Sequence, residues 1–562
     1  MWKRIFAGIV VCVFIGVGLA WLNRVSILLH VASTTGKLEV AENRSVTWVQ
    51  GPAQPETDRS EGPPNIVFIL ADDLGINDIS AFGGGVAGGR VPTPNIDRLA
   101  AEGAMFSNAY SGAATCAPSR AMLMTGRYPT RTGFEFTPAP AAMSRIIPLL
   151  ITNEHEEAGL PPLRVNPAFA ESGIEYRDMG LPPEEVTIAE VLKPTGYHSV
   201  HIGKWHLGGN RPFRAVSQGF DESLLMGSGL FLPEDDPNAV NAKLEFDPLD
   251  VFLWARMQFA VDYDRAGEDE TEDMFQPAKY ITDYYTDEAL NVIEANKHQP
   301  FFLYLAHFGV HTPLQATRED FEAVGEIEPH RLRVYAAMVR ALDRSVGRIL
   351  DKLEAEGLTD NTIVVFSSDN GGAGYLGLEG LNAPYRGWKA TLFEGGIRVP
   401  LFIKWPRKID GGAVVDAAVA HVDLMPTFAA AAGASIPVGT VIDGQDILPL
   451  ATGGSATLAR PDDALYWSSG FYKAVRSGQW KLQINERQDK AWLINLGEDP
   501  SERVNLADTH PEKLAELKAL LDAHWADARP PLYPHAMEWP VRLDTPTTAP
   551  HTAEDEFVVW PN

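Results

Sequence analysis

The chain has 562 residues, of which 45% are hydrophobic and 22% charged, and this balance excludes a largely disordered protein. Its 74 acidic and 47 basic residues give a formal net charge of -27, which would repel nucleic-acid phosphates, so nucleic acid is not expected as a partner. At this length we expect one large α/β domain and a smaller second one.

The N-terminus has the pattern of an export signal. Lys3 and Arg4 precede an almost uninterrupted apolar run from Ile5 to Leu22. Residues 1–24 are therefore predicted to be a cleaved signal peptide or a membrane anchor, because the run is about long enough to span a bilayer. A buried core helix is the alternative. Residues 25–63 are expected to be a solvated linker.

Four short apolar runs share one design. They are apolar on successive residues, as expected for strands buried on both faces of a mostly parallel sheet. The runs extend from Asn65 to Leu70, Ser199 to Ile202, Phe301 to Ala306 and Thr362 to Phe366. Helical patterns lie between them, one beginning at Pro94 and one from about Arg331 to Ala355. This alternation predicts an α/β domain over residues 64–450, with a large mixed, mostly parallel sheet flanked by helices.

The pattern changes after about Leu450. Polar and apolar residues mix in runs that begin at Ala464, Tyr472 and Trp480, the last two in alternation, and a further run begins at Ala491. We expect an antiparallel sheet with a helix from about Pro511 to Ala526, so that residues 451–528 form a smaller α+β subdomain. Residues 529–562 are predicted to be a Pro-rich tail.

Polar residues follow all four predicted strands of the large domain. Because ligands collect at the carboxyl ends of strands in such sheets, we expect these residues to form one site. Asp72, Asp73, Asp369 and Asn370 are hard oxygen donors, which favour Ca²⁺ or Mg²⁺ over zinc. Capping of the next helix is the alternative for Asp72 and Asp73. The second pair, at the end of another predicted strand, favours a metal site.

Basic residues are expected at the same sheet edge. Lys204 and His206 are two positions apart, so their side chains point the same way in an extended segment. Lys389 follows a Gly-rich loop after the fourth strand, and Arg120 adds a further cation. Such a set suits a tetrahedral oxyanion. His311 lies just past the third strand, where an imidazole can serve a leaving group.

Cys116 is the only cysteine outside the N-terminal run, so the exported body can form no intramolecular disulfide. This favours a bacterial periplasmic or cell-surface location. A helix is predicted to start at Ser119, and a thiol at its N-terminus beside Arg120 is expected to have a lowered pKa. Oxygen ligands nevertheless match a soft thiolate poorly, which indicates that Cys116 is chemically converted before it acts.

The segment around Cys116 resembles a known family. Cys116-Ala117-Pro118-Ser119-Arg120 followed by Thr125-Gly126-Arg127 matches the C-x-P-S-R and T-G-R signature of sulfatases, within the alkaline phosphatase superfamily. Further family-like segments are Ala71–Gly75, Gly203–Gly208, Val310–Pro313, Ser368–Gly372 and Gly387–Lys389. The resemblance covers roughly Pro64 to Ala526. It looks closest to arylsulfatases, including the N-acetylgalactosamine-4-sulfatase type.

The resemblance implies an alkaline phosphatase-like fold and a sulfuric ester hydrolase. In that family a formylglycine-generating enzyme oxidises the motif cysteine to Cα-formylglycine. The hydrate of residue 116 would attack sulfur, while Ca²⁺ held by Asp72, Asp73, Asp369 and Asn370 neutralises the sulfate oxygens.

The resemblance also assigns roles to the basic residues. Lys204, Lys389 and His311 would bind the sulfate, and His311 or Lys389 would protonate the leaving alcohol. His206 would help the second hydroxyl of the hydrate expel sulfate, and Arg120 would hold the hydrate.

Two alternatives remain at this level: a phosphate or phosphonate monoester hydrolase of the same superfamily, and a non-catalytic, membrane-tethered binding protein. The substrate is expected to be a sulfated small molecule or carbohydrate. Insertions from about Phe134 to Pro183 and Leu230 to Gln276 are predicted to wall the pocket. Ser228 is a candidate for a serine near the sulfate, although no motif supports this assignment.

Overall fold

The computed structural model describes Phe6 and residues 23–34, 37–55, 62–151, 160–268, 273–552 and 554–562. The apolar run predicted to be a signal or anchor therefore lies, apart from Phe6, outside the described residues. Within the described residues, no helix combines the length and the apolar character needed to cross a bilayer.

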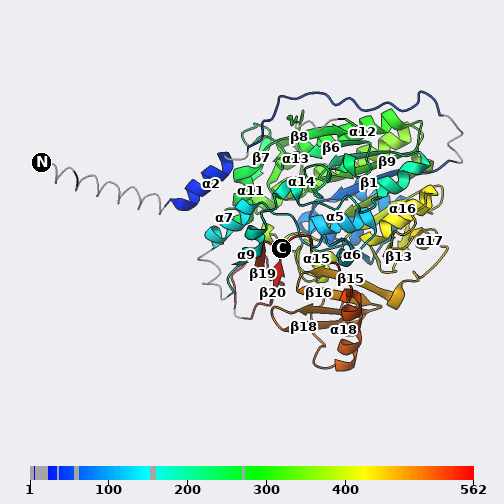
Figure 1. The fold of residues 1–562 in the computed structure, drawn as a ribbon. Coiled ribbons are helices and arrows are strands. Elements are labelled where there is room, and N and C mark those ends of the chain that lie inside the picture. The colour runs from blue at the N-terminus through cyan, green and yellow to red at the C-terminus, as the bar shows by residue number, and fades with distance from the viewer. Residues whose placement is uncertain are drawn as a thin grey trace.

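A large mixed sheet forms the centre of the molecule (Figure 1). Among the described residues it has nine strands in the order β13-β2-β12-β11-β1-β9-β5-β6-β8. The four strands predicted from apolar runs are β1 (Asn65–Ala71), β5 (His198–Gly203), β9 (Phe301–Ala306) and β11 (Thr362–Ser368). They pair in parallel, β11 with β1, β1 with β9 and β9 with β5, which confirms the predicted parallel core of the sheet.

The outer strands make the sheet mixed. β6 runs parallel to β5, whereas β8 and β12 pair antiparallel with β6 and β11. β2 continues antiparallel to β12, and β13 is parallel to β2. Their bounds are β2 (Ala104–Phe106), β6 (Glu222–Met226), β8 (Val261–Arg265), β12 (Leu401–Lys404) and β13 (Ala413–Val415).

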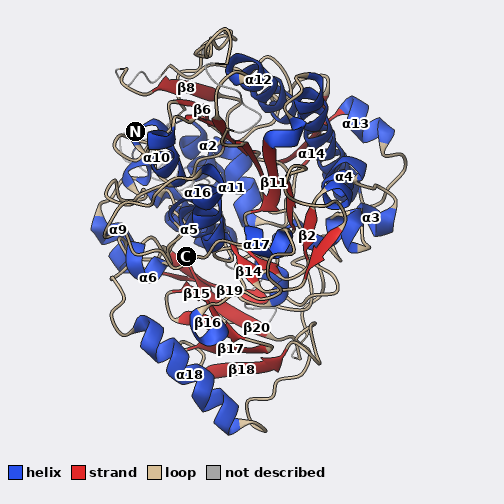
Figure 2. Ribbon diagram, turned by 90° about the vertical axis from the view of Figure 1, so that its right-hand side faces the viewer, coloured by secondary structure: helices blue, strands red, loops and turns tan. Residues whose placement is uncertain are grey.

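Helices cover both faces of the sheet, which is why the central strands are apolar at successive positions. Val67 and Ile69 of β1 pack into one apolar core, whereas Phe68 and Leu70 pack into another on the opposite face. The first core includes α4 (Pro94–Glu102), α12 (Ile281–Asn296) and α14 (His330–Ala355). The second includes α5 (Cys116–Thr125), α10 (Ile188–Leu192) and α16 (Leu424–Ala432). Figure 2 shows α4 and α14 on one side of β11, and α5 and α16 on the other.

The C-terminal sheet also follows the sequence pattern. Its strands β15 (Ala464–Ser469), β16 (Tyr472–Ser477), β17 (Trp480–Asn485) and β18 (Lys490–Asn495) pair antiparallel in sequence order. Helix α18 (Pro511–Trp525) packs on it through Leu517 and Leu521, which are buried against Val475 and Leu482. This sheet and helix lie at one end of the molecule in Figure 1.

The segment after residue 529 contains two strands. β19 (Met537–Arg542) and β20 (Phe557–Pro561) pair antiparallel, and β4 (Arg164–Val165) of the first insertion joins them. Near this sheet lie α7 (Ala141–Ile151), α9 (Pro167–Ser172) and α11 (Pro248–Arg256), and α2 (Arg24–Thr34) contacts α7 and α11 (Figure 1).

The remaining elements are short. They are α3 (Val86–Gly89), α6 (Pro129–Thr132), α13 (Arg318–Ala323), α15 (Glu394–Ile397), α17 (Leu448–Ala451), β3 (Ala109–Tyr110), β7 (Ala239–Ala242), β10 (Leu314–Thr317) and β14 (Val419–Ala420).

Candidate active site

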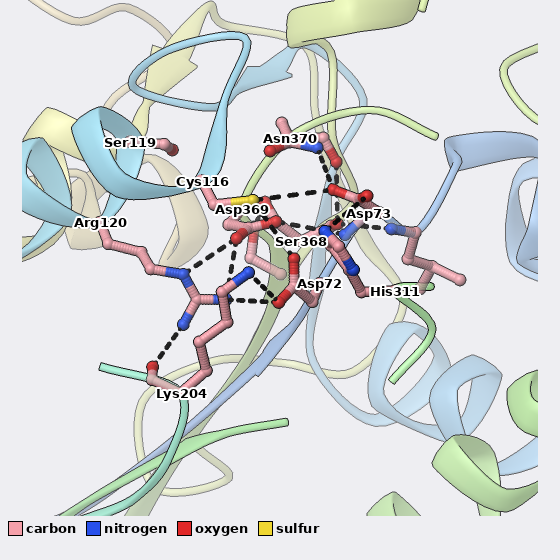
Figure 3. Close-up of polar contacts among 12 residues, drawn as sticks. Asp72, Asp73, Cys116, Ser119, Arg120, Lys204, His311, Ser368, Asp369 and Asn370 are labelled. Atoms are coloured by element: carbon pink, nitrogen blue, oxygen red, sulfur yellow. Dashed lines mark hydrogen bonds and ion pairs between the residues drawn. The ribbon is translucent and has the colours of Figure 1, made fainter. Parts of the chain in front are cut away.

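The carboxyl ends of the parallel strands bring the predicted oxygen donors together (Figure 3). Asp72 and Asp73 follow β1, and Asp369 and Asn370 follow the neighbouring β11. The Asp73 amide donates to Asp369 Oδ1 at 3.2 Å, and Asn370 Nδ2 donates to Asp73 Oδ1 at 2.8 Å. Asp73 adopts a left-handed φ of 59°, which turns the chain sharply where β1 ends. All four side chains are buried.

Cys116 lies beside these carboxylates at the first position of α5. Its Sγ is 3.4 Å from Asp72 Oδ1 and 3.8 Å from Asp73 Oδ1, and Lys389 Nζ approaches it to 3.3 Å. The helix begins at Cys116 itself, three residues before the predicted start at Ser119.

The expectation of a lowered thiol pKa is wrong. Burial and the nearby carboxylates of Asp369 and Asp72 raise the pKa of Cys116 well above its ordinary value, despite the opposing charges of Lys204 and Lys389. Arg120 does not reverse this, because its guanidinium is paired with the same carboxylates. An unconverted thiol at this position stays protonated near neutral pH and is therefore a weak nucleophile.

Arg120 holds the carboxylate cluster from one side. Its Nε donates to Asp369 Oδ2 at 2.9 Å, and its Nη2 is 2.8 Å from the same oxygen and 3.4 Å from Asp72 Oδ2. Its Nη1 donates to the main-chain oxygen of Lys204 at 2.6 Å. The side chain is wholly buried, so Arg120 connects helix α5 to the ends of β1, β11 and β5.

The two predicted lysines each contact one member of the Asp72-Asp73 pair. Lys204 Nζ donates to Asp72 Oδ2 at 2.5 Å, and Lys389 Nζ is 2.7 Å from Asp73 Oδ1. Burial acts to lower the pKa of each ammonium, but the facing carboxylate outweighs it and raises the pKa of both lysines. Burial likewise acts to raise the pKa of Asp73, but the surrounding cations, Lys389 foremost, lower it below its ordinary value.

The two predicted histidines follow different strands, and both line the active-site cavity. His311, after β9, has Nε2 3.6 Å from Asp73 Oδ2, and its Nδ1 lies 2.5 Å from the Thr312 carbonyl oxygen. Burial lowers the pKa of His311 to about 3. His206 follows β5 with a left-handed φ of 60°, and burial and the charge of Lys204 lower its pKa well below the ordinary value. Both imidazoles are therefore neutral near pH 7.

Tyr375 is a site residue that the sequence reasoning missed. Its hydroxyl donates to Asp73 Oδ2 at 2.8 Å, and Lys389 Nζ is 3.4 Å from the Tyr375 hydroxyl oxygen. An aromatic residue inside the Gly-rich loop after Asn370 is the only signal that the sequence offered. Ser228 lines the active-site cavity, but its hydroxyl accepts a hydrogen bond from the main-chain amide of Gln258 at 2.7 Å rather than facing the carboxylates.

One cavity of about 1300 Å³ is lined by all of the candidate catalytic residues except Arg120. Its lining includes Cys116, Lys204, His206, His311 and Lys389. Stretches from both predicted insertions, such as residues 137–143 and 246–249, also line it, which confirms that the insertions wall the pocket. A single buried sheet edge thus presents fixed cations and neutral imidazoles to one cavity, and the carboxylates hold those cations in place. This arrangement defines a hydrolase for esters of a tetrahedral oxyanion.

Comparisons with known proteins identify the family. The sulfatase family model matches residues 64–434, and the model of the C-terminal part of N-sulphoglucosamine sulphohydrolase matches residues 386–529. N-acetylgalactosamine-6-sulfatase of Canis lupus familiaris is 34% identical over 460 residues, which is 80% of this chain and 78% of the relative. Steryl-sulfatase of Homo sapiens is 33% identical over 493 residues, or 78% of this chain and 77% of the relative.

Solved structures agree. The structure described as Ps i-CgsB in complex with k-i-k-neocarrahexaose is 30% identical, with a TM-score of 0.67, and the match covers 84% of this chain and 94% of that chain. The chain therefore belongs to the sulfatase family and is a sulfuric ester hydrolase with an alkaline phosphatase-like fold. These relatives are a 6-sulfatase and a steryl-sulfatase, whereas the motifs resembled arylsulfatases, including the N-acetylgalactosamine-4-sulfatase type.

Proposed function

We propose that the enzyme hydrolyses sulfate esters through residue 116 after conversion of Cys116 to Cα-formylglycine. The observation that carries this proposal is the position of Cys116 between Asp72, Asp73 and Lys389, at the floor of the cavity. Its raised thiol pKa makes the unmodified side chain a weak nucleophile here. A hydroxyl of the aldehyde hydrate is an oxygen nucleophile that suits the surrounding oxygen donors.

The same oxygen donors suit Ca²⁺, with Mg²⁺ as the other candidate. Asn370 Oδ1 is a buried oxygen without a hydrogen-bond partner among the described residues, and it belongs to the cluster formed with Asp72, Asp73 and Asp369. Asp72, Asp73, Cys116 and His311 can also each place one ligand atom within 4.8 Å of the others. We propose Asp72, Asp73, Asp369, Asn370 and residue 116 as the ligands. When bound, a divalent cation would neutralise negative charge on the sulfate oxygens and on residue 116.

The residues that face the cavity have separate roles in sulfate binding and in proton transfer. Lys204 and Lys389 are charged and fixed against Asp72 and Asp73, so they supply positive charge for the sulfate. Of the two candidate proton donors to the leaving alcohol, Lys389 carries a proton near neutral pH, whereas His311 is neutral above about pH 3. His206 is neutral, and its Nδ1 lacks a partner among the described residues, so it can accept a proton when sulfate is expelled.

Two measurements test this function together. Mass analysis of the peptide that contains residue 116 should detect the aldehyde, and kcat/KM for an aryl sulfate should exceed that for the matching aryl phosphate. An intact thiol in fully active enzyme would contradict the nucleophile. A preference for the phosphate would favour the rival monoester hydrolase. Full biological function of a Cys116→Ala variant would favour a binding protein instead.

The location follows as a separate proposal. We propose that the protein is exported to a bacterial periplasm or cell surface, with residues 1–24 as cleaved signal or anchor, and that a formylglycine-generating enzyme matures it. The support is the basic and apolar N-terminal pattern and the intact C-x-P-S-R motif at Cys116. Cell fractionation with N-terminal sequencing tests it, and recovery of full-length protein in the cytosol would contradict it.

A further inference from the structure

The segment from residue 530 to 562 lies beyond both matched family models, yet it reaches the active-site cavity. The models end at residues 434 and 529. Strands β19 and β20 of this segment form a hairpin that pairs with β4 of the first insertion. Residues from both strands, Trp539 and Trp560 among them, line the same cavity as Cys116. The hairpin is therefore a wall that lies outside the residues matched by the two family models.

This hairpin is attached to the loop that carries Lys389. Arg386 Nε donates to Asp544 Oδ1 at 2.8 Å, and Arg386 Nη2 is 2.8 Å from Glu556 Oε2. The Gly387 amide donates to the Leu543 carbonyl oxygen at 3.2 Å. Because these contacts come from residues two and three positions before Lys389, the hairpin has a fixed place relative to the reacting end of the site.

Two tryptophans form the face of this wall. Trp539 and Trp560 are direct cross-strand partners in the β19–β20 ladder, and both are half-buried residues of the cavity lining. Directly opposed residues in a ladder lie side by side, so two aromatic side chains share this face of the hairpin. The rest of the lining is also rich in half-buried apolar side chains, namely Met143 of α7, Met226 of β6, Leu249 and Leu253 of α11, and Met257.

Several polar residues of the lining are already committed to the protein itself. Arg542 is bonded to Asp555 and to main-chain oxygens of residues 546 and 547. Gln258 bonds the main chain of Leu38 through both ends of its amide. Asp247 caps α11 by accepting from the amides of residues 249 and 250. Buried sugar hydroxyls need hydrogen-bond partners, and these residues have little capacity left to provide them.

From this arrangement we infer that the enzyme selects sulfate esters of bulky, flat, apolar alcohols, and that Trp539 and Trp560 are specificity-determining residues that bind the alcohol. The inference rests on the proposed function, because it concerns the alcohol side of the same site. The sulfate would lie against Lys204 and Lys389, and the fused rings of the alcohol against the two indoles. A volume of about 1300 Å³ leaves room for several fused rings.

The test compares three esters: 1-pyrenyl sulfate, 4-nitrophenyl sulfate and N-acetylgalactosamine 6-sulfate. The wild-type enzyme should show the highest kcat/KM for the pyrenyl ester. Trp539→Ala and Trp560→Ala should each lower kcat/KM for the pyrenyl ester about tenfold more than for the nitrophenyl ester, mainly through KM, because each removes one aromatic contact face. Trp539→Phe should recover most of this difference. Trp480→Ala removes a half-buried tryptophan of the C-terminal sheet that is not in the lining, and it should leave the ratio unchanged.

The outcomes separate this inference from the proposed function. A higher kcat/KM for the sugar sulfate, or an equal loss on both aryl esters in the tryptophan variants, would overturn the inference while leaving the sulfatase function intact. Binding of 1-hydroxypyrene, followed by its fluorescence, provides a readout without turnover. Weaker binding to both alanine variants supports the inference even if none of the three esters is hydrolysed, which would count against the proposed function alone. Unchanged binding would overturn it.

Discussion

Replacing Arg120 by lysine tests whether its guanidinium holds the carboxylate cluster in position. Lysine keeps the charge but has one nitrogen, so it cannot keep both the bond to Asp369 Oδ2 at 2.9 Å and the bond to the Lys204 carbonyl oxygen at 2.6 Å. A hydrogen bond that involves a charged group contributes about 1.5–3 kcal/mol, so we expect a loss of about 3 kcal/mol in total. If the transition state loses the same amount, kcat/KM falls about 100-fold.

The assay is urea unfolding together with kcat/KM on an aryl sulfate, corrected for the fraction of residue 116 found as aldehyde by mass analysis. That correction matters because Arg120 is part of the motif around Cys116. The matched control is Arg214→Lys. Arg214 is also buried and bridges two carboxylates, Asp262 at 2.8 Å and Asp264 at 3.2 Å, but these carboxylates belong to β8 and not to the active-site cluster.

Arg214→Lys should lower the free energy of unfolding by a similar amount and leave kcat/KM within about twofold of wild type, because buried ion pairs affect stability wherever they lie. An Arg120→Lys enzyme with wild-type kcat/KM per aldehyde would refute the positioning role. So would an equal loss of activity in the Arg214 variant, since the effect would then be one of general stability.

Three further predictions concern the divalent cation, Tyr375 and the buried Asp78 next to the end of β1. Removing divalent cations with EGTA should abolish turnover and lower the urea midpoint of unfolding. Addition of Ca²⁺ should restore both in the wild type but not in Asp369→Asn. Activity that does not change on chelation would exclude the metal. Tyr375→Phe removes the 2.8 Å hydrogen bond to Asp73 and should lower kcat/KM about fivefold, since such a bond contributes about 1 kcal/mol; an unchanged rate would remove Tyr375 from the site. Burial raises the pKa of Asp78 to about 7, so between about pH 4 and pH 7 the folded state holds a proton that the unfolded chain has released. The contribution of Asp78 to the free energy of unfolding therefore falls as the pH rises through this range. Urea unfolding should show Asp78→Asn gaining about 3 kcal/mol relative to wild type between pH 5 and pH 8, and an equal difference at both pH values would contradict the raised pKa.

The sequence determined the frame of the molecule. Strands β1, β5, β9 and β11 could be found because residues buried on both faces must be apolar at successive positions, and the parallel order then placed Asp72, Lys204, His311 and Asp369 at one edge. The motif around Cys116 identified the family because a local recognition sequence is written in consecutive residues. The antiparallel C-terminal sheet was equally legible from its alternation.

Tertiary structure alone decided the properties that depend on neighbours distant in sequence. The thiol pKa of Cys116 is raised rather than lowered because the side chain is buried, because Asp369 and Asp72 lie nearby, and because Arg120 is paired with those carboxylates. The sequence could not show that Tyr375 bonds Asp73, nor that a tail read as Pro-rich forms a hairpin with Trp539 facing the cavity. Local patterns record which side of an element is buried, whereas pKa values and pocket walls depend on which other elements fold against it.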